Sequence, residues 1–130
     1  MTATAYAITK DVDGAFDDVV ERVREALSNE GFGVLSTIDI KKALKEKLDH
    51  DVEPYLILGA CNPSLAREGL EIEPDLGVLL PCNVVVRSRD GGVRVAAMEP
   101  TAALHLAQNP GLEQLANEAR DRISRAVASL

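Results

Sequence analysis

The 130-residue chain contains no tryptophan, and aromatic residues make up only 3% of it. Proteins that bind single-stranded nucleic acid stack bases on aromatic side chains, so this scarcity argues against that function. Basic residues are also in the minority, because 14 lysines and arginines stand against 21 aspartates and glutamates, a net charge of -7. Phosphate backbones and anionic membrane surfaces attract clustered cations. We therefore expect no nucleic-acid partner and no membrane partner.

Long apolar runs and a signal-peptide pattern are also missing. The apolar segments Leu56–Cys61 and Val78–Val86 are far shorter than the ~18 residues that suggest a membrane span. The N-terminus has no basic region followed by an apolar one, which predicts a cytoplasmic location. The chain has two cysteines, and in a reducing compartment we expect both to be thiols.

What is present fits one ordinary globular domain. The length suits a single domain spanning residues 1–130, and 46% apolar with 27% charged residues is typical of such domains. No internal repeat, low-complexity tract or long linker divides the chain.

Helical spacing of apolar residues predicts long helices near both ends of the chain. The first follows Asp13, its predicted N-cap, and ends at Gly31, where a left-handed residue is needed. The last opens with Asn109-Pro110, a cap and a first helical residue. Their apolar stripes are Phe16, Val19, Val20, Val23 and Leu27 in the first helix, and Leu112, Leu115, Ala116, Ala119, Ile123, Ala126, Val127 and Leu130 in the last.

Shorter helices are predicted over Ile40–Leu48, capped by Asp39, and from Asn62-Pro63 to about Leu70. In the former, we expect the apolar side chains to face inward and the lysines to form a solvated outer face; a docking patch for an acidic partner is the alternative. One or two helical turns are expected over Thr101–Gln108. The inward residues are Ile40, Leu44 and Leu48, and the lysines are Lys41, Lys42, Lys45 and Lys47.

Five strands are predicted, over Ala5–Lys10, Phe32–Ile38, Tyr55–Cys61, Val78–Arg87 and Gly92–Met98. Asp90-Gly91 predicts a two-residue hairpin turn between the last two. The resulting register pairs Ser88 with Val93, Val86 with Val95, Val84 with Ala97 and Cys82 with Glu99. A valine-rich face then meets the helices, whereas the other face carries Asn83, Val85, Arg87, Arg94, Ala96 and Met98. Arg87 and Arg94 stand opposite each other on it, which requires water or acidic partners nearby.

The two cysteines occur in similar phrases, Tyr-Leu-Ile-Leu-Gly-Ala-Cys-Asn-Pro and Gly-Val-Leu-Leu-Pro-Cys-Asn-Val-Val-Val. Both thiols are interpreted either as small buried hydrophobes or as a thiol site. For the second interpretation, Cys61 precedes a helix N-terminus, which favours a thiolate, and Cys82 would face Glu99 as a proton acceptor. The candidate ligand-binding or thiol site is Cys61, Asn62, Cys82, Asn83 and Glu99.

No catalytic constellation is recognisable, so the sequence leaves open whether the protein is an enzyme. Two cysteines supply half of a tetrahedral zinc site, the Cys-x-x-Cys spacing is missing, and nothing positions His50 or His105 to complete one. There is no phosphate-binding loop and no nucleophile elbow. His105 has no evident carboxylate partner beyond Glu99, which favours a surface or core histidine over a catalytic base. We expect no metal and no cofactor.

Three segments, Glu30–Ile40, Tyr55–Pro63 and Leu79–Val86, resemble the "domain of unknown function 302" family, and the likeness extends over essentially the whole chain. The resemblance implies a compact α+β domain with a single curved antiparallel sheet of about five strands backed by helices, similar to TATA-binding-protein-like folds. It also suggests a homodimer. It carries no established reaction, and fold likeness to a DNA binder does not imply DNA binding.

Two functions follow from these observations. The first is a non-enzymatic binding or assembly domain that dimerises through its sheet or edge strands and holds a small molecule near Cys61 and Cys82. The alternative is a thiol-dependent activity, either redox switching or sulfur transfer, with Cys61 as the more reactive sulfur.

Overall fold

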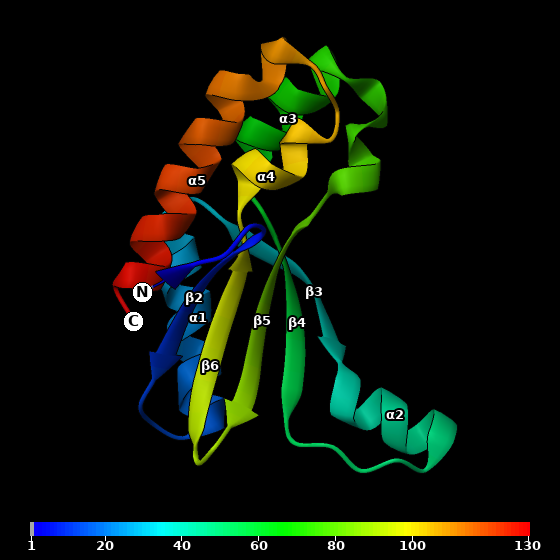
Figure 1. Ribbon diagram of the computed structural model, residues 1–130, viewed down its shortest axis with the longest axis vertical. Coiled ribbons are helices and arrows are strands. Elements are labelled where there is room, and N and C mark those ends of the chain that lie inside the picture. The colour runs from blue at the N-terminus through cyan, green and yellow to red at the C-terminus, as the bar shows by residue number, and fades with distance from the viewer. Residues whose placement is uncertain (1) are drawn as a thin grey trace.

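A computed structural model describes residues 2–130 and contains one antiparallel sheet with helices on one of its faces (Figure 1). The strand order is β1-β2-β6-β5-β4-β3. This confirms the predicted α+β fold; five longer strands are joined by β1, a two-residue strand that the sequence did not indicate. The strands are β1 (Thr2–Ala3), β2 (Ala7–Val12), β3 (Gly33–Asp39), β4 (Tyr55–Cys61), β5 (Cys82–Arg89) and β6 (Gly92–Met98).

Five α-helices and two 3-10 segments complete the described chain. They are α1 (Phe16–Asn29), α2 (Ile40–Leu48), α3 (Pro63–Ile72), η1 (Pro74–Leu79), α4 (Pro100–His105), η2 (Pro110–Leu112) and α5 (Glu113–Ala128). The two longest, α1 and α5, pack on one face of the sheet, whereas α3, α4 and η1 gather beyond one of its ends (Figure 1). None of the helices within residues 2–130 has the length and apolar composition of a membrane-spanning segment.

The predicted hairpin and its register are confirmed. Asp90 and Gly91 both have positive φ, as a two-residue turn between twisted strands requires. Ser88 pairs with Val93, and the ladder continues as far as Val84 and Ala97. The valine face is the main core, because Val84, Val86, Val93, Val95 and Ala97 are all buried in one cluster with residues of α1 and α5.

The first strand and first helix begin later than predicted. The ladder between β2 and β6 runs from Ala7 opposite Met98 to Val12 opposite Val93, so pairing with β6, and not local alternation, sets the ends of the strand. Asp13 consequently lies in the turn and is not the cap of α1. The N-cap is Ala15, which makes no side-chain capping bond. The predicted helix end is confirmed, since Gly31 follows the C-cap with φ +83°.

Residues expected to start the fourth strand form a 3-10 helix instead. Val78 lies in η1, α3 continues to Ile72, and β5 starts at Cys82. Pro81 precedes that strand and has no N–H to donate, so the ladder can begin only after it. The two apolar residues before Pro81 therefore join the helical layer and not the sheet.

Helix α2 has the predicted bounds and cap but not the predicted burial. The Asp39 carboxylate accepts a hydrogen bond from the Lys42 amide at 2.9 Å. No residue of α2 is buried, and Leu48, expected to face inward, is 70% exposed. The expectation was wrong because α2 projects from the end of β3, the last strand of the sheet, where no second layer covers it (Figure 1).

A second apolar cluster lies beyond the end of the sheet. Leu76, Leu104, Leu112 and Ala116 are its buried members, contributed by η1, α4, η2 and α5. Asn109 and Pro110 open η2 and not α5 directly, since the Asn109 side chain accepts from the Gly111 amide at 2.9 Å. Leu104, Leu112 and Ala116 of this cluster also line the pocket described below.

Candidate functional site: a pocket between α4 and α5

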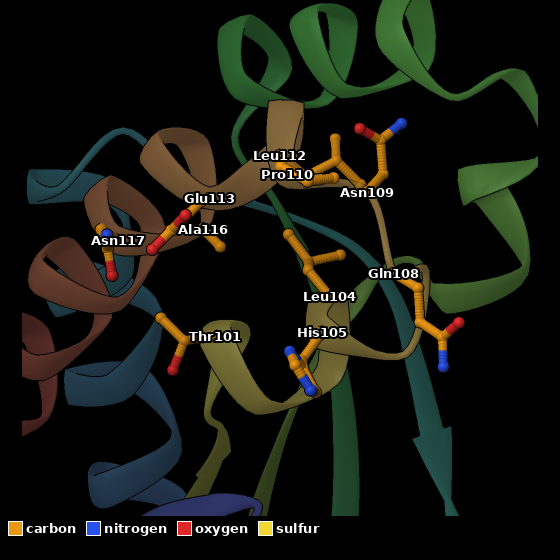
Figure 2. Close-up of a pocket in the computed structure, with 10 residues that line it drawn as sticks. All are labelled: Thr101, Leu104, His105, Gln108, Asn109, Pro110, Leu112, Glu113, Ala116 and Asn117. Atoms are coloured by element: carbon orange, nitrogen blue, oxygen red, sulfur yellow. The ribbon is translucent and has the colours of Figure 1, made fainter.

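The pocket has a volume of about 580 Å³ and lies between α4, the loop after it and the first turns of α5 (Figure 2). The chain reverses direction in that loop, where Gln108 adopts a positive φ of 51°. The lining residues are Thr101, Leu104, His105, Gln108, Asn109, Pro110, Leu112, Glu113, Ala116 and Asn117.

Glu99 fixes where α4 starts. Its carboxylate accepts hydrogen bonds from the Thr101 amide at 3.0 Å and the Ala102 amide at 3.1 Å, and also from the Thr101 hydroxyl. These bonds satisfy amides at the helix N-terminus that have no partner within the helix. Thr101 and His105 therefore project from a helix whose first turn is anchored.

The pocket combines an apolar floor with a polar rim. Leu104, Leu112 and Ala116 are buried and belong to the second apolar cluster. Figure 2 shows Glu113 and Asn117 of α5 across the pocket from α4, which carries Thr101 and His105.

The rim has hydrogen-bonding capacity available for a ligand. Within residues 2–130, the side chains of His105, Glu113 and Asn117 make no hydrogen bond or ion pair. The Asn109 side-chain oxygen accepts a hydrogen bond from the Gly111 amide, and its NH2 group remains available as a donor. The pocket can therefore seat an apolar group on its floor and several polar groups at its rim.

Sequence reasoning missed this pocket. His105, expected at the surface or in the core, is exposed. The other rim residues carried no motif, because α4 and α5 meet only through tertiary packing. The one available signal was Asn109-Pro110, which separates two helical segments closely enough for them to pack side by side.

The residues of the predicted cysteine site lie elsewhere and serve different structural roles. Asn62 is the N-cap of α3, accepting from the Leu65 amide at 3.2 Å. Asn83 is exposed and lies opposite Gly59. Glu99 caps α4, and the β5–β6 ladder ends before Cys82 could pair with it, so the expected Cys82–Glu99 pairing is wrong.

The two cysteines are not cross-strand partners. Cys82 is opposite Ala60 on β4, whereas Cys61 is opposite Gly33 on β3. Cys82 packs against the main core, whereas Cys61 is the last residue of β4, next to the start of α3. Both thiols are free and partly buried. The structure therefore does not show the expected cysteine pair.

Cys82 lies in an environment that keeps its thiol protonated, and the cavity beside the two cysteines is small. Burial raises the pKa of Cys82 to about 11, with a smaller contribution from the charge of Cys61. Cys61, Asn62 and Cys82 help to line a narrow apolar cavity of only about 40 Å³ between the sheet and the helical layer. A cavity of this size holds little more than a water molecule. It is therefore too small for the kind of ligand that the pocket of about 580 Å³ between α4 and α5 can hold.

Comparison with known proteins places the whole fold in one family of unknown activity. Residues 8–130 match the model of the family described as "Domain of unknown function DUF302". The crystal structure of an uncharacterised conserved DUF302 protein from Bacillus stearothermophilus is similar, with 30% sequence identity and a TM-score of 0.88; the match covers 94% of this chain and 95% of that one. No curated protein matches the chain.

Proposed function

The chain belongs to the DUF302 family, for which no activity is described, and we propose that it is a non-enzymatic domain that binds a small molecule between α4 and α5. The observation that carries this proposal is a pocket of about 580 Å³ with an apolar floor and a polar rim. Small-molecule sites have volumes of roughly 300–1,000 Å³ and combine apolar walls with a few polar groups. This pocket has both properties, and it replaces the neighbourhood of Cys61 and Cys82 as the proposed ligand site.

The rim favours a ligand that carries a hydrogen-bond donor, and preferably a positive charge. Glu113 is the only acidic residue that lines the pocket, and the chain as a whole carries a charge of -7. An ammonium group directed at Glu113 would make a charge-assisted hydrogen bond. Asn117 and His105 can bond further polar groups, and the apolar body of the ligand would contact Leu104 and Ala116. The class is therefore small amines with an aliphatic part.

Calorimetric titration with a panel of small aliphatic amines, and with carboxylic acids of matched size, tests this proposal. Binding of an amine should weaken about tenfold in Glu113→Gln, since one charge-assisted hydrogen bond is lost. Glu118→Gln is the matched control, because Glu118 lies on the same helix, pairs with Arg122 and does not line the pocket. An equal loss in both variants would contradict the proposed contact with Glu113.

A homodimeric assembly is a second candidate, favoured by the arm formed of β3 and α2. Leu35 and Ile38 are 73% and 49% exposed, and no residue of α2 is buried. Large apolar side chains exposed together mark interaction surfaces. The register shift between Val34 and Ser36 interrupts the outer edge strand, which hinders addition of a further strand. A second copy would therefore contact the side chains of the arm and not extend the sheet.

The thiol-dependent alternative has less support. With a pKa of about 11, Cys82 is protonated near neutral pH, and the thiol is a poor nucleophile compared with the thiolate. Any such activity would depend on Cys61, which precedes the N-terminus of α3. Mass spectrometry of protein purified without reductant tests it: a persulfide or disulfide at Cys61 would support sulfur chemistry, and two unmodified thiols would not.

A further inference from the structure

The face of the sheet opposite α1 and α5, which we call the open face, has no helix over it (Figure 1). An apolar row crosses four of its strands, since Ile38 pairs with Ile57, Ile57 with Val85 and Val85 with Ala96. At about 4.8 Å between strands, the row is roughly 14 Å long. The side chains of Ile57, Val85 and Ala96 are partly exposed, and Ile38 is 49% exposed.

Three guanidinium groups lie beside this row. Arg87 pairs directly with Arg94 across the hairpin, and Arg89 shares their face two residues after Arg87. Like charges directly opposite each other destabilise a sheet, so this arrangement requires compensation.

The compensation on the face is incomplete. The Asp11 carboxylate is the counter-charge of two of the three arginines. It accepts a hydrogen bond from Arg94 at 3.3 Å and lies 3.7 Å from the Arg89 guanidinium. Asp90, in the turn, lies 3.6 Å from Arg89. Arg87 makes no hydrogen bond or ion pair with any residue from 2 to 130, although its side chain is partly buried. One guanidinium thus remains without a counter-charge in a chain of net charge -7.

We propose that the open face docks an acidic segment of a partner protein, whose apolar side chains lie on the row and whose carboxylates pair with Arg87. This inference is independent of the pocket between α4 and α5. A guanidinium can bind a carboxylate through two parallel hydrogen bonds, which would neutralise Arg87 and relieve its repulsion with Arg94. The acidic partner supplies the charge that this face lacks.

A second copy of the chain fits the open face less well. Two open faces would each bring three arginines to the contact. Helix α2, in which no residue is buried, carries Lys41, Lys42, Lys45 and Lys47 and would add further positive charge to such a contact. Charge complementarity therefore favours an acidic segment from another protein.

The test uses a short synthetic peptide rich in leucine and glutamate, and the same peptide with every glutamate replaced by glutamine. Binding is followed by amide chemical shifts of the intact protein. We expect the acidic peptide to shift Ile57, Val85 and Ala96, and the Arg87→Gln variant to bind it about tenfold more weakly. Arg87→Lys should recover part of the loss. Arg67→Gln is the control, since Arg67 is an exposed arginine on α3, away from the sheet.

Several results would overturn the proposal. Equal binding of both peptides would show that charge does not matter, and equal affinity of Arg87→Gln and wild type would remove Arg87 from the contact. Preferential binding of anionic phospholipid vesicles would assign the face to a membrane. Self-association that Arg87→Gln abolishes would assign it to a second copy. The melting temperature of Arg87→Gln should not fall, because the change removes a like-charge pair.

Discussion

Lys10 on β2 joins the first long strand to the end of the chain, because its Nζ donates to the carbonyl oxygen of Leu130 at 2.9 Å. The same ammonium also donates to the carbonyl of Ala128 at 3.0 Å. These carbonyls lie at the C-terminal end of α5, where a cation is favourable for the helix dipole. Lys10 is therefore a cap supplied by the sheet to the helix that forms one wall of the pocket.

Replacing Lys10 with methionine should lower the free energy of unfolding by about 1–2 kcal/mol, because two hydrogen bonds to a charged donor are lost. Lys41→Met on exposed α2 is the control and should change it by less than about 0.5 kcal/mol. Urea denaturation of both variants measures the difference. Equal stability of Lys10→Met and the wild type would show that the cap contributes nothing.

Gly59 on β4 should not tolerate alanine. A Cβ at this position would overlap the Ser36 hydroxyl and lie 3.0 Å from the Pro81 ring. Relieving that overlap requires the Ser36 side chain to rotate and the Pro81 ring to shift, which should lower the free energy of unfolding, measured by urea denaturation, by about 1–3 kcal/mol.

Gly33 offers a matched control on the neighbouring strand. A Cβ at Gly33 meets no atom within 4 Å, and its backbone does not have a positive φ. Gly33→Ala should therefore leave the free energy of unfolding almost unchanged when both variants are measured by urea denaturation. A similar loss of stability in Gly59→Ala and Gly33→Ala would contradict the prediction that a steric overlap at Gly59 causes the loss.

The raised pKa of Cys82 predicts that the protein loses stability in alkali. Burial raises the pKa of the Cys82 thiol from 9.0 in the unfolded chain to about 11 in the folded chain, so between these pH values the folded state holds the proton more tightly. The contribution to stability is fully present below pH 9 and disappears as pH rises through 11. Two pKa units at about 1.36 kcal/mol each give an upper limit of about 2.7 kcal/mol.

Denaturation curves measured from pH 8 to about pH 11 test this linkage. Cys82→Ala should lose most of the pH dependence in this range, whereas Cys61→Ala should keep the larger part of it, because burial is the main cause of the raised pKa. A wild-type protein whose stability does not fall between these pH values would show that Cys82 is not shielded as the structure indicates.

The β3–α2 arm predicts a specific effect on oligomeric state. Leu48→Glu places a charge on an apolar side chain that is 70% exposed, and it should shift a homodimer towards monomer in sedimentation equilibrium. Val78→Glu is the control, because Val78 is 86% exposed but lies in η1, away from the arm. A wild-type protein that sediments as a monomer would contradict the assembly proposal.

Features set by neighbouring residues were predictable from sequence. Asp90-Gly91 specified the hairpin, and the caps Asp39 and Asn62 specified where α2 and α3 start, because these signals act within a few residues. The hairpin register then identified the buried valine face without reference to any other part of the chain.

Features set by long-range packing were not predictable. Helix α2 has an amphipathic sequence, but whether Leu48 is covered depends on what lies beyond β3, which periodicity does not encode. The pairing of Cys82 with Ala60 depends on a β5 start set by Pro81 and on the position of β4. The pocket arises where α4 and α5 meet, so no single stretch of sequence carries its pattern.

Binding of a small amine in the pocket between α4 and α5 can be mapped residue by residue. The most direct measurement is a chemical-shift map of the protein titrated with the tightest-binding amine of the panel. We expect shifts concentrated at Thr101, His105, Glu113 and Asn117, with none at Cys61 or Cys82. Shifts centred on the two cysteines, or no shift at the pocket with any amine, would contradict it.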